Sequence, residues 1–187
     1  ERRNRMPDTG NADTVFAEGD GYFSMSVKTA ADGAPYVLVE NKMTKAQLSN
    51  YQTVADYIAE HIGEAYTILE SGQKVYIGKD LPNEYTQSQY TKRILQTSKL
   101  TAKNKAVSNL GEMIEIASNR RWEKTRHAGN KDAPYGMYRY DTTFAFPVQG
   151  GARYKAFDAE LVIRNASDGK KYLYDIVSIK ENTGLAL

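Results

Sequence analysis

The strongest constraint on the fold is an alternation of apolar and polar residues near the C-terminus. Within residues 153–164, the run from 157 to 164 has four apolar side chains on one parity and three charged ones on the other. The first parity consists of Phe157, Ala159, Leu161 and Ile163, and the second of Asp158, Glu160, Val162 and Arg164. Because successive side chains of a strand point to opposite faces, we predict a half-buried strand with Glu160 and Arg164 outward together.

Two flanking segments also have strand character. In residues 138–147 the apolar parity holds Tyr138, Tyr140, Phe144 and Phe146, and the opposite parity holds Arg139, Asp141 and Thr143. Residues 171–179 are apolar on both parities, with Leu173, Asp175, Val177 and Ile179 on one and Tyr172, Tyr174, Ile176 and Ser178 on the other. Glycine-containing links at 149–151 and 165–169 predict hairpins, and hence an antiparallel meander.

Helical spacing precedes the meander. We predict helices over residues 88–102 and 104–118, and the second carries one apolar stripe suited to packing on a sheet. That stripe consists of Ala106, Leu110, Met113, Ile114 and Ala117. The fold class expected is therefore α+β, with helices on one face of a C-terminal antiparallel sheet and the other face open to bind.

The first half of the chain predicts a small N-terminal α+β subdomain over residues 21–86, after a polar tail or linker at 1–20. We expect a hairpin from 21–27 and 35–40, a helix from the Thr44 cap to about Gly63, and strands at 66–69 and 74–77. Pro82 predicts an irregular connection over 78–86. Residues 87–187 then form the second unit.

Composition excludes several classes of site. The chain has no cysteine and only two histidines, so disulfide scaffolds, thiol nucleophiles and Cys- or His-rich metal sites are not expected. We predict no metal and no cofactor. No apolar run reaches the length of a membrane span, and no signal peptide is evident. His61, expected in the last turn of its helix, is assigned a structural role.

Charge is segregated along the chain. Residues 1–90 hold eight Lys/Arg against thirteen Asp/Glu, whereas residues 91–187 hold seventeen against ten. The basic half includes a predicted loop over 119–131 that bears His127. Such asymmetry is typical of an anion-binding or nucleic-acid-binding face, although a charge run is also often simply solvated.

Several strings of this half resemble a known family. They are residues 131–148, 159–164 and 168–176, together with 84–88 and the helix bearing Asn109, so the resemblance covers roughly residues 66–180. The chain is similar to the large polyvalent protein-associated domains of phage and mobile-element polyproteins, grouped with the barnase–EndoU–colicin–RelE-like (BECR) nucleases. The resemblance implies a helix-plus-four-stranded antiparallel sheet and metal-independent RNA cleavage. A barnase-like acid and base pair in matching order is not evident.

The catalytic candidates follow from what metal-free RNA cleavage requires, namely a base, an acid and cations at the phosphate. His127 is expected to be exposed and to act as acid or base, with Asp141 or Glu160 as its counterpart. The family resemblance suggests Lys131 and Arg164 as phosphate clamps, and Glu160 is expected to orient Arg164. The alternative for the carboxylates and Arg164 is an ordinary ion pair on the strand surface.

Substrate binding is assigned to cations and to tyrosines that can stack on bases. The candidates are Arg120, Arg121, Lys124, Arg126, Arg139, Thr143, Tyr172 and Tyr174. Cross-strand packing is the alternative for the two tyrosines.

The function that these features favour is a metal-independent ribonuclease toxin domain. RNA is the expected substrate and a cognate immunity protein a possible partner. The site of action would be the bacterial cytoplasm, reached by phage or a secretion system. A non-catalytic module that binds nucleic acid or protein is the alternative, and ADP-ribosyl transfer a weaker one, because no nucleotide-binding signature is evident.

Overall fold

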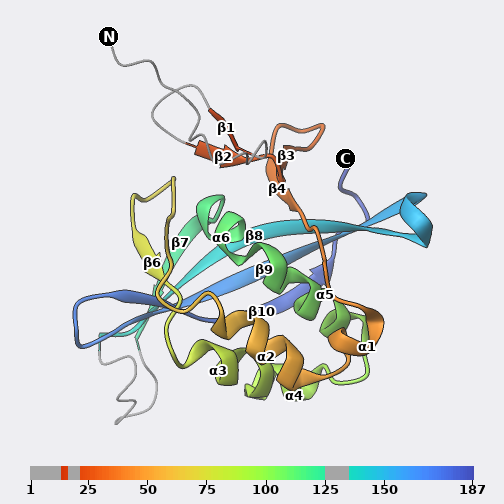
Figure 1. Cartoon of the computed structure of the whole chain (residues 1–187). Helices are drawn as coiled ribbons and strands as arrows, with labels where there is room; N and C mark the ends of the chain where they lie inside the picture. The colour runs from red at the N-terminus through yellow and green to blue at the C-terminus, as the bar shows by residue number, and fades with distance from the viewer. Residues whose placement is uncertain (1–13, 17–21, 125–134) are drawn as a thin grey trace.

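In the computed structural model, the described residues are 14–16, 22–124 and 135–187. The centre of the fold is a meander of three long antiparallel strands, β8 (Met137–Val148), β9 (Arg153–Asn165) and β10 (Lys171–Glu181) (Figure 1). These three strands confirm the sequence prediction. The short 3-10 helix η2 (Gln149–Gly151) joins the first two of them.

Shorter strands extend the meander into an eight-stranded, mostly antiparallel sheet with the order β3-β4-β8-β9-β10-β6-β5 and with β7 also paired to β8. Their bounds are β3 Val27–Thr29, β4 Pro35–Leu38, β5 Ala65–Thr67, β6 Lys74–Tyr76 and β7 Ser118–Glu123. Along one edge, β7 pairs with the first half of β8 and β4 with its second half. A separate hairpin is formed by β1 (Thr14–Phe16) and β2 (Tyr22–Ser24).

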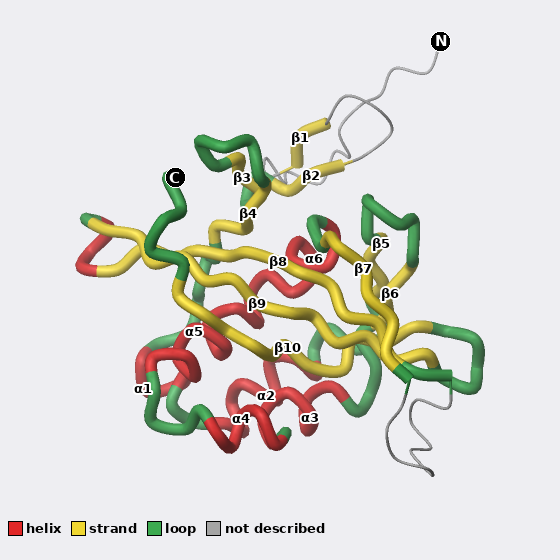
Figure 2. Tube along the Cα trace, turned by 180° about the vertical axis from the view of Figure 1, so that it is seen from behind, coloured by secondary structure: helices red, strands yellow, loops and turns green. Residues whose placement is uncertain are grey.

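The helices pack against one face of this sheet (Figure 2). They are α1 Lys45–Leu48, α2 Tyr51–Ala59, α3 Leu81–Gln87, α4 Gln89–Arg93, α5 Ser98–Ala106, the 3-10 helix η1 Val107–Asn109, and α6 Leu110–Glu115. The hydroxyl of Thr142 on β8 donates to the carbonyl of Met113 on α6, which fixes the inward side of the strand. The predicted α+β class with a helix-covered sheet is confirmed.

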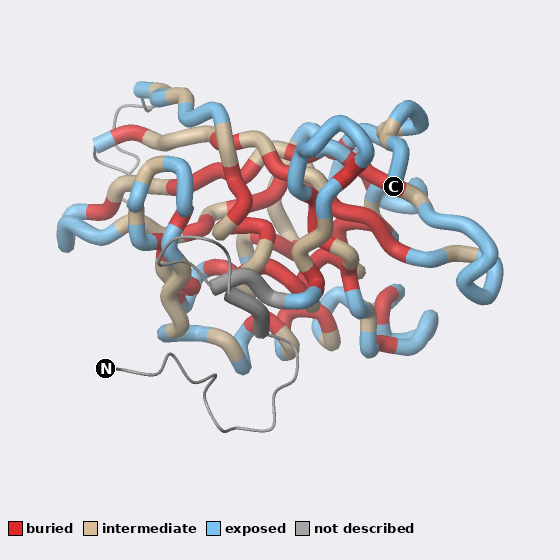
Figure 3. Tube along the Cα trace, turned by 90° about the horizontal axis from the view of Figure 1, so that it is seen from above, coloured by how far each residue is buried: buried red, intermediate tan, exposed pale blue. Residues whose placement is uncertain are grey.

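The alternation that predicted β8 and β9 is the reason the core forms. Phe144 on β8 and Phe157 on β9 stack at 5.7 Å between ring centroids, and Leu161, farther along β9, is completely buried in the same core. Buried positions run along the central strands while the hairpin ends are exposed (Figure 3). The opposite parity carries half-buried polar side chains, among them Arg139, Asp141 and Glu160, but also the buried Ala145, Ala156 and Val162. It is called the open face below, although a second hydrophobic cluster covers Ala145 and Ala156.

Strand β10 departs from the predicted alternation. Asp175 and Ile176 are consecutive and both buried, because the pairing with β9 shifts between Leu173 and Asp175. A second shift lies between Val177 and Lys180, where Ser178 has a φ of 53°. The prediction that Ile176 faces away from Leu173 was therefore wrong, since a bulge changes which residues point inward.

The single helix predicted from Thr44 to Gly63 is two helices. Thr44 caps α1 through a reciprocal capping box with Gln47, as its position suggested. Asn50 then starts α2, because its side chain accepts hydrogen bonds from the backbone N–H groups of Gln52 and Thr53. His61 lies beyond the end of α2, where its Nδ1 is 3.0 Å from the Glu64 carboxylate.

The connection predicted over residues 78–86 was wrong, because α3 begins at Leu81. Pro82 is tolerated there because it occupies the first turn, where a missing N–H costs no helical hydrogen bond. The two long helices predicted over 88–118 are instead α4, α5, η1 and α6. Their first break follows Arg93, and Gln96 in the link has a φ of 61°.

The predicted basic loop over 119–131 begins as strand β7, which corrects the loop prediction for residues 119–123. The predicted boundary near residue 86 coincides with no break in the sheet. Strands β4 and β6 from the first unit pair with β8 and β10 of the second, and one hydrophobic core runs through both units.

Candidate nucleic-acid interface

Two groups of polar residues on the open face are candidates for a functional site. The first, named the arginine–carboxylate cluster, consists of Arg121, Glu123, Arg139, Asp141 and Glu160 on β7, β8 and β9. The second, named the aromatic pocket, is a cavity of about 550 Å³. Its lining includes Tyr76, Gly78, Lys79, Asp80, Arg164, Asp168, Lys170 and Tyr172.

The arginine–carboxylate cluster is built by strand register. Asp141 and Glu160 lie directly opposite each other on β8 and β9. Nη2 of Arg121 lies between them and donates to Asp141 Oδ1 at 2.8 Å and to Glu160 Oε2 at 2.7 Å. Asn119 Nδ2 donates to the other Asp141 oxygen at 2.8 Å. The side chain of Arg121 therefore links three strands.

A second guanidinium group completes the cluster. Nη1 of Arg139 lies 3.9 Å from Glu160 Oε1, and its Nε lies 3.1 Å from Glu123 Oε2. That Nε is buried and is not aligned to donate a hydrogen bond. Glu160 is thus flanked by two arginines, with its side chain 27% exposed against 48% for Asp141.

Both carboxyl groups are held in the charged form. Burial alone would raise the pKa of Glu160, but hydrogen bonds from Ser178 and Arg121 and the charges of both arginines bring that pKa below its usual value. The pKa of Asp141 is also lowered, because hydrogen bonds from Asn119 and Arg121 outweigh the effect of burial. Each side chain is therefore an anion at neutral pH.

The aromatic pocket lies where β6, β9 and β10 meet. Tyr172 and Arg164 are opposite each other on β10 and β9, and the guanidinium carbon is 4.6 Å from the ring centroid. Tyr76 pairs with Tyr172 across the parallel β6–β10 ladder, with ring centroids 6.0 Å apart. Ammonium groups of Lys74 and Lys170 lie 5.6 Å and 5.0 Å from the Tyr76 ring.

The structure separates Arg164 from Glu160. Nη2 of Arg164 lies 3.4 Å from Asp80 Oδ2, whereas Glu160 is paired with Arg121 and Arg139. The prediction that Glu160 orients Arg164 is therefore not met, although both share the open face. The Val162 side chain lies between them along β9 and is buried.

The remaining predicted residues are dispersed. Arg120 lies over the Tyr138 ring at 5.2 Å, Thr143 donates to Asp158 at 2.9 Å, and Lys124 is exposed at the end of β7. Tyr174 lines a smaller neighbouring cavity together with Arg164.

Arg126, His127 and Lys131 lie outside the described residues. The strands that flank them are informative, because Glu123 pairs with Met137, and Met137 pairs with Arg164. The described ends of this connection therefore lie at the same end of the sheet as the aromatic pocket.

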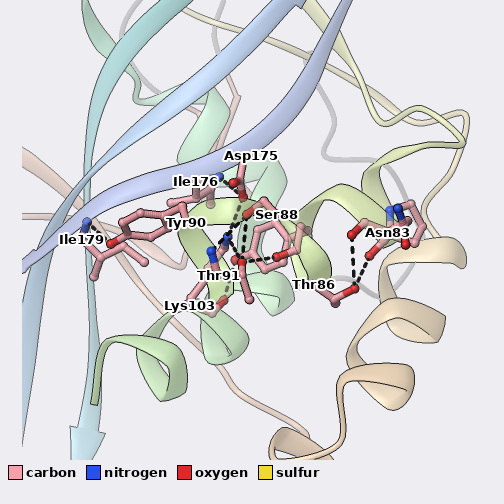
Figure 4. A network of polar contacts seen from close by, with 11 residues as sticks. Asn83, Thr86, Ser88, Tyr90, Thr91, Lys103, Asp175, Ile176 and Ile179 are labelled. Atoms are coloured by element: carbon pink, nitrogen blue, oxygen red, sulfur yellow. Dashed lines mark hydrogen bonds and ion pairs between the residues drawn. The ribbon is translucent and has the colours of Figure 1, made fainter. Parts of the chain in front are cut away.

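Sequence reasoning missed a buried ion pair between helix α5 and strand β10 (Figure 4). Nζ of Lys103 donates to Asp175 Oδ1 at 2.5 Å and to the Thr91 hydroxyl at 2.6 Å. The Lys103 side chain is fully buried and faces the rings of Tyr85 and Tyr90 at 4.6 and 5.3 Å. The only signal in the sequence was an aspartate within an apolar strand.

Comparison with family models and with curated proteins found no match for this chain. Across the described residues, His, Asp and Glu form no group that could hold a metal ion. The helices of the described part are too short or too polar to cross a membrane.

Proposed function

We propose that this domain is a metal-independent endoribonuclease that cleaves RNA by attack of a 2′-hydroxyl on the adjacent phosphate. The proposal is carried by one observation, the position of the Glu160 carboxylate between Arg121 and Arg139 on the open face. Such a reaction needs a base and positive charge at the same phosphate. The arginine–carboxylate cluster can supply both.

In the proposed reaction Glu160 accepts the proton of the 2′-hydroxyl as the O2′–P bond forms. The O5′–P bond breaks, and His127 donates the proton to the leaving 5′-oxygen. The products are a 2′,3′-cyclic phosphate and a 5′-hydroxyl. The two guanidinium groups stabilise the negative charge that builds on the phosphate, for which planar, bidentate donors are suited.

The geometry favours Glu160 over Asp141 as the base. Glu160 contacts two arginines, whereas Asp141 contacts Asn119 and one arginine, Arg121, among the described residues. Asp141 then serves to keep Arg121 aimed at the phosphate while Glu160 exchanges its proton. Cations of the aromatic pocket, Arg164 among them, bind the RNA beside the cluster.

The test is cleavage of an end-labelled RNA in EDTA by the parent chain and by Glu160→Gln, His127→Ala and Asp158→Asn. Loss of a general base or acid is expected to slow cleavage by about 10²- to 10⁴-fold. Asp158→Asn is the matched control, because Asp158 is a carboxylate on the same face of β9 that contacts Thr143 and Asn182. Cleavage at the parental rate by Glu160→Gln would refute the assignment.

A second candidate is a non-catalytic module that binds nucleic acid. The observation in its favour is that Arg121 contacts both carboxylates, so that opposite charges within the cluster satisfy each other. Salt-dependent retention of RNA without any new RNA ends would favour this function.

The context that we propose for the ribonuclease is the toxin end of a phage-associated polyprotein, with an immunity protein as its inhibitor.

A further inference from the structure

We infer that the aromatic pocket is a nucleotide-binding subsite, which takes one phosphate at Arg164 and one base against the rings of Tyr76 and Tyr172. The inference rests on the proposed function in that RNA is the expected ligand. It is independent of the chemistry at Glu160, because Glu160 and Arg164 are four positions apart on β9, roughly 13 Å along a strand.

The size of the pocket fits one nucleotide. Its volume of about 550 Å³ lies within the range of small-molecule sites. Two tyrosine rings, 6.0 Å apart and tilted by 47°, form an aromatic wall on its β6–β10 side. An aromatic wall accepts any base by stacking, and such contacts do not require a particular sequence.

Arg164 is already held in place to bind a phosphate. Its side chain is only 12% exposed and lies against the Tyr172 ring, so little rotamer freedom remains to be lost on binding. Its contact with Asp80 is long, at 3.4 Å, and the Asp80 side chain is half exposed. A phosphate can therefore share or displace that carboxylate.

The charges around the pocket favour an anion. Lys79, Arg164 and Lys170 line it against the two carboxylates of Asp80 and Asp168. Asp168 is already engaged, since it accepts hydrogen bonds from the Tyr172 hydroxyl at 2.5 Å and from the backbone N–H of Lys170 at 2.8 Å. The lining therefore has a net positive charge beside an aromatic surface, which matches a nucleoside phosphate better than either phosphate or an apolar ligand alone.

Gly78 shows that the Tyr172 ring is closely fitted. A Cβ atom at this position would lie 2.8 Å from Cδ1 of Tyr172 and 3.6 Å from Nη2 of Arg164. The backbone that leaves β6 thus packs directly on the ring, with no space for a side chain. Gly78→Ala is expected to displace Tyr172 and so to change the pocket without removing any of its polar groups.

The direct test is calorimetric titration of the full chain with adenosine monophosphate, adenosine and inorganic phosphate. We expect the monophosphate to bind and the other two to bind at least about tenfold more weakly, because each keeps only half of the contacts. Equal affinity for phosphate and for the monophosphate would overturn the inference, as would no binding of the monophosphate at millimolar concentration.

Variants localise the binding. Arg164→Gln and Tyr172→Leu are expected to weaken monophosphate binding roughly ten- to hundredfold, since each removes a charge-assisted or stacking contact. Tyr172→Phe, which keeps the ring, should retain affinity and guards against a variant that fails to fold. Arg153→Gln and Tyr154→Leu are matched controls, because both residues are exposed at the opposite end of β9. Unchanged binding in Arg164→Gln would place the ligand elsewhere and refute the subsite.

The two proposals fail separately. Glu160→Gln should bind the monophosphate as the parent does, whether or not it cleaves RNA. Monophosphate binding by a parent chain that never cuts RNA would leave the subsite standing and remove the nuclease. Cleavage that depends on Glu160, in a chain with no affinity for the monophosphate, would do the opposite.

Discussion

Replacing Asp175 by asparagine should destabilise the protein more than any change on its surface. The substitution leaves the Lys103 ammonium, whose side chain is fully buried, without its carboxylate at 2.5 Å. Removing one partner of a buried ion pair typically costs about 3 to 5 kcal/mol. The Thr91 hydroxyl and the rings of Tyr85 and Tyr90 remain in contact with the ammonium, so we expect about 3 kcal/mol.

The assay is urea and thermal unfolding followed by circular dichroism. For a chain of this length about 3 kcal/mol corresponds to a fall in Tm of roughly 6 to 12 °C. Lys103→Met should cost a similar amount because it strands the carboxylate instead. The double variant Lys103→Met, Asp175→Leu should recover most of the loss, since apolar residues of similar volume often replace a buried pair without penalty.

The pH dependence gives an independent check. Burial lowers the pKa of Lys103 and raises that of Asp175, despite their mutual attraction. A raised carboxyl pKa contributes stability at low pH that is lost as pH rises through the folded value. A lowered amine pKa contributes stability at high pH that is lost as pH falls through the folded value. The free energy of unfolding of the double variant, relative to that of the parent, should therefore be highest near neutral pH and lowest at acidic and alkaline pH.

Two results would refute this reasoning. A loss below about 1 kcal/mol in both single variants would mean that the pair is not buried as described. A loss in the double variant equal to the sum of the two single losses would mean that the residues do not interact.

Three further changes test other parts of the fold. Gly111→Ala should lower the free energy of unfolding in urea by about 1 to 3 kcal/mol, because the new Cβ would lie 2.2 Å from Cε1 of the Tyr66 ring. Gly150→Ala is the control, because its Cβ would meet open space and the change tests only the left-handed φ of that turn. Asn50→Ala should cost about 1 kcal/mol by removing the α2 cap, and Asn50→Ser should restore most of it. Burial, together with the charge of Glu112, raises the pKa of Glu115 to about 7. The stability that this raised pKa contributes is present at low pH and is lost as pH rises from the ordinary carboxyl range through about 7. Unfolding free energies measured at about pH 5 and about pH 8 should differ less in Glu115→Gln than in the parent, and an unchanged difference would contradict the shift.

The parts of the fold that could be predicted are those in which one residue in two is apolar. Strands β8 and β9 were correct to within a residue or two because their inward parity has almost no exceptions. The sequence predicts a loop where β7 lies, because Arg120 and Arg121 resemble a solvated charge run. Arg121 is in fact paired with carboxylates of two other strands, which no local pattern reveals.

The candidate site also has a part that follows from local alternation and a part that depends on strands distant in the sequence. The outward parity correctly brought Asp141 and Glu160 to one face, because register and alternation are local consequences of a hairpin. The partner of Arg164 was not predictable, since Asp80 lies 84 residues away and follows a strand that joins β10 in parallel. The pairing of Arg121 with Asp141 and Glu160 and the position of Tyr76 beside Tyr172 likewise depend on where β7 and β6 join the sheet.

The irregularity in β10 connects the buried pair to the open face. Alternation alone would place Asp175 and Ile176 on opposite sides, yet both are buried, and the shift in pairing lies immediately before Asp175. Asp175 Oδ1 also accepts from the backbone N–H of Ile176 at 2.9 Å, so the carboxylate that holds Lys103 shapes the strand at this point. Tyr172, before the shift, stays in register with Arg164 and Tyr76, while Val177, after it, lies opposite Glu160. A strand without this shift could not keep both pairings, that of Tyr172 with Arg164 and that of Val177 with Glu160. The reason is that a one-residue slip moves every following side chain to the other face. A buried carboxylate is therefore physically linked to the alignment of the aromatic pocket with the arginine–carboxylate cluster.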